Sequence, residues 1–257
     1  MPAARRERGG TLPPDDLATI LDWWRLSGAD TLVADAPTPW FAQARLAEAA
    51  ASAFNEPERP RTAPATPAPH RPDPGEPASL DELVARIRAE APGAPVADGN
   101  PRAGLMVIGE APSAEDLRTG RPFTGPAGQL LDRMLAAIGL DRSSAYIALL
   151  CPRRRLPGPP PDEAVAAELP LARAHIRLVA PRLLLLLGKI PTQALVGTSA
   201  TISEIRGQPL VVDAGAGPIP ALATFNPAYL LRAPEKKALA WADLLALNGL
   251  LQAGARP

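Results

Sequence analysis

The sequence has little that could hold a metal or form a covalent crosslink. Its 257 residues include one cysteine, Cys151, and two histidines, His70 and His175. A single thiol excludes an internal disulfide, and it excludes any cluster or zinc site that needs four cysteines from one chain. An excess of one charge is also absent, because 27 basic residues balance 27 acidic ones. A net charge near zero neither supports nor excludes DNA binding, which would require a local basic patch.

Long apolar runs are missing as well. No run approaches the roughly 18 residues that span a bilayer. The Arg-rich start at 1–10 is not followed by the hydrophobic stretch of a secretory signal. We therefore expect a cytoplasmic protein with no membrane association, and we expect it to be a monomer.

Proline is abundant, and its uneven distribution divides the chain. Eight of the 33 prolines fall in Pro57–Pro77, a segment without large apolar residues. Such a composition cannot bury enough surface to offset the entropy lost on ordering, so it predicts a flexible linker. We expect an N-terminal helical segment over 1–55, a Pro-rich linker over 56–78 and a folded domain over 79–257.

Strand and helix patterns alternate in the folded domain. Strands are predicted at Gly104–Ile108, Tyr146–Leu150, Leu183–Leu187 and Ala221–Phe225, with a short edge strand at Leu210–Val212. Helices are predicted after the capping box of Ser79 and Glu82, and at Gln129–Leu140, Asp162–Val179, Pro191–Val196 and about Pro234–Leu251. This order indicates a layered α/β fold with a largely parallel sheet. Ligands of such sheets bind beyond the carboxyl ends of the strands, which here precede Glu110, Cys151, Lys189 and Asn226.

Two segments resemble motifs of family 4 of the uracil-DNA glycosylase superfamily. The run Gly109–Ser113 followed by Thr119–Leu131 is similar to the GEAPG, GRPF and GxxGQLL patterns of that family, and Phe225–Arg232 resembles HPAYLLR. Ile205–Gly207 falls between them in the expected order, and the likeness covers about 79–247. The resemblance implies a three-layer α/β/α fold with a central, mostly parallel four-stranded sheet. It also implies a DNA glycosylase of base excision repair.

The resemblance implies a role for each matching residue. A glycosylase must extrude its target nucleotide, because the glycosidic bond cannot be reached inside the base stack. Glu110 and Asn226 are then the catalytic candidates: the carboxylate orients a water or stabilises a cationic sugar, and the amide donates to the leaving base. The substrate-binding candidates are Phe123, which stacks on the base, with Ala111, Pro112, Ser113 and Leu149. The DNA-binding candidates are Arg153, Arg154, Pro227, Tyr229, Leu230 and Arg232.

Three departures from the family's pattern bear on activity. Asn226 stands where the motif has His, and an amide cannot carry the charge of an imidazolium. Leu149 replaces the Asn of a YITN strand pattern and cannot pair with a base edge. Glu168 stands where a cysteine ligand is expected, so we expect no [4Fe–4S] cluster and no other cofactor or metal.

The same residues allow other interpretations. Phe123 could belong to the core, the run from Tyr229 to Leu231 could pack a helix, and the arginines after Cys151 could be solvated. The leading hypothesis is a DNA glycosylase with weak or altered activity. An alternative is a catalytically impaired DNA-binding or damage-sensing protein that recruits a repair partner through 1–55. A nucleotide-binding protein is a weaker third reading, because GxGxxG and P-loop patterns are absent.

Overall fold

The computed structural model describes residues 75–154 and 158–253. The expected helices over 1–55 and most of the expected linker lie outside these residues. The first described helix, α3 (Leu80–Glu90), begins as predicted, because the Ser79 side chain accepts a hydrogen bond from the backbone amide of Glu82.

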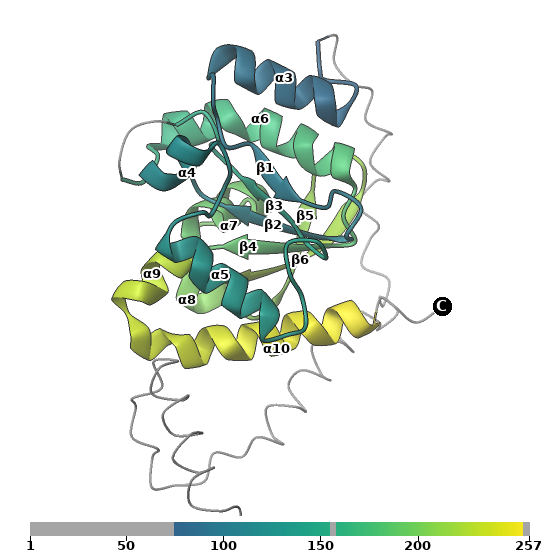
Figure 1. Cartoon of the computed structure of the whole chain (residues 1–257). Coiled ribbons are helices and arrows are strands. Elements are labelled where there is room, and N and C mark those ends of the chain that lie inside the picture. The colour runs from purple at the N-terminus through teal and green to yellow at the C-terminus, as the bar shows by residue number, and fades with distance from the viewer. Residues whose placement is uncertain (1–74, 155–157, 254–257) are drawn as a thin grey trace, which may run out of the picture. The chain divides into compact units, whose positions relative to one another are not determined.

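A six-stranded sheet forms the centre of the described part, with strand order β1-β3-β2-β4-β6-β5 (Figure 1). The strands are β1 (Ala97–Gly99), β2 (Leu105–Gly109), β3 (Tyr146–Leu149), β4 (Leu183–Leu187), β5 (Pro209–Asp213) and β6 (Pro218–Thr224). The four central strands are mutually parallel, and β1 and β5 are antiparallel edges.

The prediction of a mostly parallel sheet is thus confirmed, but the predicted number of four strands is wrong. The two additional strands lie at the edges of the parallel core, and one of them, β5, contains the short edge strand predicted at Leu210–Val212. The sequence of β1 is Ala-Asp-Gly, which has neither apolar alternation nor length. It becomes a strand through its antiparallel pairing with β3, a contact that local sequence does not encode.

Helices cover both faces of the sheet (Figure 1). They are α4 (Ala114–Thr119), α5 (Pro126–Ala136), α6 (Asp162–Val179), α7 (Lys189–Val196), α8 (Ile202–Ile205), α9 (Pro227–Arg232) and α10 (Lys237–Ala253), with a 3₁₀ turn at Pro234–Lys236. Side chains of α5, α9 and α10 pack with one face of the sheet, and side chains of α6 and α7 pack with the other. The three-layer α/β/α arrangement is therefore confirmed.

The fully apolar β4 shows why both faces must be covered. Its five leucines are all buried, and they alternate between the two cores: Leu185 packs with α5 and α10, while Leu184 and Leu186 pack with α6 and α7. Because all four parallel strands run the same way, their carboxyl ends meet at one edge of the sheet. That edge carries the loops beginning at Glu110, Leu150, Gly188 and Phe225.

The long helices are predicted better than the short ones. α6 spans its predicted range, whereas α4, α8 and α9 have four to six residues and are too short to show a periodicity. Among the described residues, no helix is both long and apolar enough to cross a bilayer.

Candidate active site

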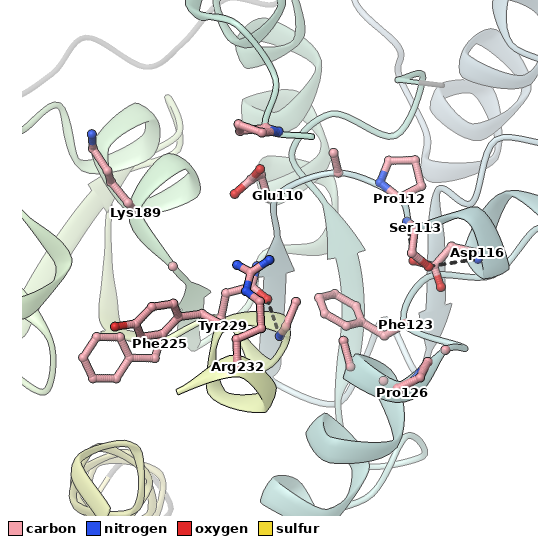
Figure 2. Close-up of a pocket in the computed structure, with 18 of the residues that line it drawn as sticks. Glu110, Pro112, Ser113, Asp116, Phe123, Pro126, Lys189, Phe225, Tyr229 and Arg232 are labelled. Carbon is pink, nitrogen blue, oxygen red and sulfur yellow. Dashed lines mark hydrogen bonds between the residues drawn. The ribbon is translucent and has the colours of Figure 1, made fainter. Parts of the chain in front are cut away.

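One cavity of about 600 Å³ opens at the carboxyl edge of the sheet (Figure 2). Glu110, Phe123 and Asn226 all line it, although they follow different strands or lie in different loops. Of the other residues proposed from sequence, Ala111, Pro112, Ser113, Tyr229 and Arg232 also line this cavity. The sequence therefore brings an acid, an aromatic ring and an amide to one cavity.

Glu110 is the first residue after β2 and is half-buried on the cavity wall. Burial raises the pKa of its carboxyl group above the ordinary value, and the positive charge of Arg154 partly opposes this rise. Arg154 also donates hydrogen bonds to the carbonyl oxygens of Gly158 and Pro159, at 3.3 and 3.0 Å. It therefore holds another part of the cavity wall while it acts on Glu110.

Phe123 lies in a backbone conformation that side chains rarely adopt, with φ at 55°. Its ring rests on the end of β2, where Gly109 leaves room: a Cβ there would lie 2.5 Å from two ring carbons. Its backbone lies against Gly128 of α5, where a Cβ would be 1.7 Å from the Phe123 carbonyl oxygen. Two glycines thus allow the ring to form a wall between the core and the cavity, and Phe123 remains 7% exposed.

A partly buried arginine holds the strained loop in place. Arg142 donates to the carbonyl oxygens of Pro122 and Phe123, at 3.1 and 2.5 Å. It also forms ion pairs with Asp98 at 2.6 Å and Asp132 at 2.8 Å. Because these contacts join β1, α5 and the loop, they offset the cost of the unusual backbone at Phe123.

Asp116 connects the two halves of the first motif. It is 4% exposed, and it accepts hydrogen bonds from the backbone amides of Ser113 at 2.9 Å and Thr124 at 2.7 Å. Ser113 in turn caps α4 through its hydroxyl oxygen. The Ser113 amide is therefore already donated, and Pro112 has none. Among the substrate-binding candidates Ala111, Pro112 and Ser113, only Ala111 can offer a backbone amide to a ligand.

Asn226 caps the short helix α9. Its Oδ1 accepts a hydrogen bond from the backbone amide of Ala228 at 2.9 Å. This bond identifies which end of the amide is the oxygen, so the Nδ2 group is left as a donor on the lining of the cavity. The side chain lies against Gly188 at the end of β4, where a Cβ would come within 3.1 Å of the Asn226 Cβ.

Several residues proposed from sequence do not line the cavity. Leu149 is 3% exposed, and it packs beside the Phe123 ring at the end of β3. Leu230 is 1% exposed and belongs to the same core, so the alternative of a packed helix describes this residue. Pro227 is buried at the start of α9. Arg153 is held by Glu168 at 2.8 Å and by Glu90.

Other residues reach the cavity without having been assigned a role from sequence. They are Asp116, Lys189, Ile202, Ser203, Phe225 and Ala228 together with Gly125–Gly128, Gly158, Pro159 and Gly188. Lys189 was expected at this edge of the sheet, because it follows a buried strand, but no role was assigned to it. Ile202 and Ser203 belong to the four-residue helix α8, which is too short to show a periodicity; its capping box of Thr201 and Glu204 is the signal that could have revealed it.

The described residues do not fit a four-cysteine cluster. Cys151 is the sole thiol of the sequence and is fully buried, and burial raises its pKa to about 12. The carboxylate of Glu168 faces the same region and pairs with Arg153. No group of three or more His, Cys, Asp or Glu side chains in the described part is placed to hold a metal ion.

Fold and cavity together define a class: a three-layer α/β protein with a cavity at the carboxyl ends of its parallel strands. Residues 96–245 match the model of the uracil DNA glycosylase superfamily. Since the match covers more than half of the chain, the protein belongs to this superfamily.

Individual relatives agree with this assignment. A protein of Thermotoga maritima named Type-4 uracil-DNA glycosylase is 35% identical over 142 residues, which are 53% of this chain and 71% of the relative. A protein of the same name from Pyrobaculum aerophilum is 32% identical over 160 residues, covering 59% of this chain and 80% of the relative. A third protein of this name, from Archaeoglobus fulgidus, is 32% identical over 143 residues, which are 53% of this chain and 71% of the relative.

Proposed function

We propose that this protein is a DNA glycosylase that hydrolyses the N-glycosidic bond of deaminated or otherwise damaged bases, with weak or altered activity. The observation that carries the proposal is the meeting of Glu110, Phe123 and Asn226 on one cavity. Its relatives named as uracil-DNA glycosylases support the reaction class. Such an enzyme works in base excision repair.

The cavity provides a group for each part of the reaction. The extruded base lies against the Phe123 ring, which forms an apolar wall. The bond between the sugar C1′ and the base nitrogen breaks, and its electron pair leaves with the base. Asn226 Nδ2 donates a hydrogen bond to the oxygen on which negative charge develops. A water oxygen then bonds to C1′, and Glu110, in its ionised form, accepts the proton of this water and stabilises the cationic sugar.

Asn226 and Leu149 explain why the activity would be weak or altered. A neutral amide stabilises a developing anion less than a charged donor does, and losing one such donor costs on the order of 10²–10³ in rate. The buried Leu149 offers no polar group to the base edge. Discrimination between bases would therefore depend on stacking and on few hydrogen bonds, which gives weak selectivity.

A panel of damaged bases tests the proposal. Purified protein in excess is incubated with single and double strands that contain uracil, hypoxanthine or xanthine, and abasic sites are revealed by alkaline cleavage. We expect abasic product from at least one base, and we expect Glu110→Gln to abolish it. The absence of abasic product from every strand would overturn the proposal.

The replacements at 149 and 226 also favour a second candidate function. In it, the protein binds DNA and senses damage without turnover, and 1–55 recruits a repair partner. It predicts DNA binding that weakens as salt rises, with no abasic product. For either function we propose that the protein acts as a cytoplasmic monomer.

A further inference from the structure

A column of stacked groups leads from the interior to the rim of the cavity. The guanidinium carbon of Arg206 lies 5.5 Å from the centre of the Phe225 ring. That ring packs against Tyr229, with ring centres 5.4 Å apart and planes inclined by 33°. Phe225 is 3% exposed and Tyr229 is 38% exposed, so the column ends in an open aromatic ring. Figure 2 shows the two rings side by side near Arg232.

The inner end of this column is fixed by a buried carboxylate. Asp243 of α10 is 1% exposed, and it accepts hydrogen bonds from Arg206 Nη2 at 2.6 Å and Nε at 3.0 Å. Thr224, the last residue of β6, donates to the same carboxylate at 2.7 Å. A two-pronged ion pair of this kind sets the orientation of the guanidinium. Tyr229 therefore rests on a rigid support, which lowers the entropy lost when its ring is immobilised by a ligand.

Neither neighbouring leucine offers an equivalent surface. Leu230 is buried in the core, and Leu231 is 43% exposed but does not line the cavity. Of the three aromatic residues on the described cavity wall, Phe123 and Phe225 are buried, and Tyr229 is the exposed one.

Two cations line the same cavity as this ring. Lys189 and Arg232 line the same cavity, and neither forms an ion pair with any other described residue. Proteins that bind single-stranded nucleic acid combine an open aromatic ring with cations along the same groove, because the ring stacks on a base while the cations meet the backbone phosphates.

We propose that Tyr229 is a stacking platform for the base next to the target nucleotide, and that it makes single-stranded DNA the preferred substrate. The inference rests on the proposed function for its choice of DNA. In a duplex the neighbouring base is already stacked and paired, so it meets the tyrosine only after those contacts are broken. In a single strand the base is available at little cost.

Binding to undamaged DNA tests this inference without turnover. Fluorescence anisotropy gives the Kd for a labelled single strand of mixed sequence and for the matching duplex. The protein should bind the single strand more tightly. Tyr229→Ala should weaken single-strand binding by about 10-fold, as expected for one stacked base, and should change duplex binding far less. Tyr229→Phe should retain the binding.

Leu231→Ala is the matched control, since it removes exposed apolar surface from the same helix but away from the cavity. Equal affinity for both forms of DNA would overturn the inference, and so would an equal loss in both alanine variants or the absence of DNA binding. Thermal unfolding shows whether each variant is folded. A protein that excises no base but shows the Tyr229 effect loses the glycosylase proposal and keeps this inference. A protein that excises a base but shows no Tyr229 effect keeps the glycosylase proposal and loses this inference.

Discussion

Replacing Asn226 by His should make the protein less stable and more active at the same time. The structure gives Asn226 two tasks, because its oxygen caps α9 and its nitrogen is a donor on the cavity wall. Histidine is a poor helix cap, so the replacement should cost about 1 kcal/mol of unfolding free energy. That loss corresponds to a fall in Tm of roughly 2–4 °C for a domain of this size.

The gain in activity follows from the charge of the new donor. A charged donor forms hydrogen bonds roughly twice as strong as a neutral one, and a difference of 1.4 kcal/mol changes a rate by a factor of about ten. We therefore expect excision of uracil from a single strand to rise about tenfold in Asn226→His, measured as the single-turnover rate with protein in excess.

Asn226→Asp separates the two tasks. Aspartate caps helices as well as asparagine does, but it has no N–H to donate. This variant should keep the Tm and lose excision. If Asn226→His were as stable as the parent, or if Asn226→Asp kept full activity, the two tasks assigned to Asn226 would be refuted.

Two further predictions test the surroundings of the cavity, and a third tests a buried histidine on α6. The acid limb of the pH profile of kcat/KM should lie above pH 4.5, since burial raises the pKa of Glu110. Arg154→Ala should move this limb to higher pH, because it removes the charge that opposes the rise. Arg154→Lys keeps the charge and should leave the limb in place. Gly128→Ala should cost about 1–3 kcal/mol of stability and abolish excision, because its Cβ meets the loop backbone at 1.7 Å. The control Gly249→Ala, with open space around it, should leave stability unchanged or higher in urea unfolding. Burial lowers the pKa of His175 to about 4, so the unfolded state binds the proton more tightly than the native state does. The free energy of unfolding should therefore fall by about 3 kcal/mol as the pH falls from 6.5 to 4. His175→Gln should flatten this pH dependence, measured by urea titrations.

Replacing Leu149 by the Asn of the family's strand pattern should destabilise the protein, because position 149 is buried. Leu149 is 3% exposed and lies against the Phe123 ring. An amide placed there would be buried without a partner, which costs about 1–3 kcal/mol. Leu149→Asn should therefore destabilise the protein, and a double variant with Asn226→His should unfold at a lower temperature than either single variant.

Much of the fold was readable from sequence because its signals are local. The five leucines of β4 predict a strand buried on both faces, and α6 is long enough for its apolar period to define its range. The strand β1 and the helix α8 were not predicted, since three or four residues cannot display a period. Their structures depend on neighbours that are distant in the sequence.

The sequence by itself determined the order of strands and helices, the motifs of the superfamily and the edge of the sheet at which a site forms. Only the tertiary structure decided which side chains face that site. It buried Leu230 and exposed Tyr229, used the amide oxygen of Asn226 to cap α9, and held Phe123 in place through Arg142. The reason is that periodicity reports the average face of an element. The direction of one side chain in a short helix or loop depends on what packs against it from elsewhere in the chain.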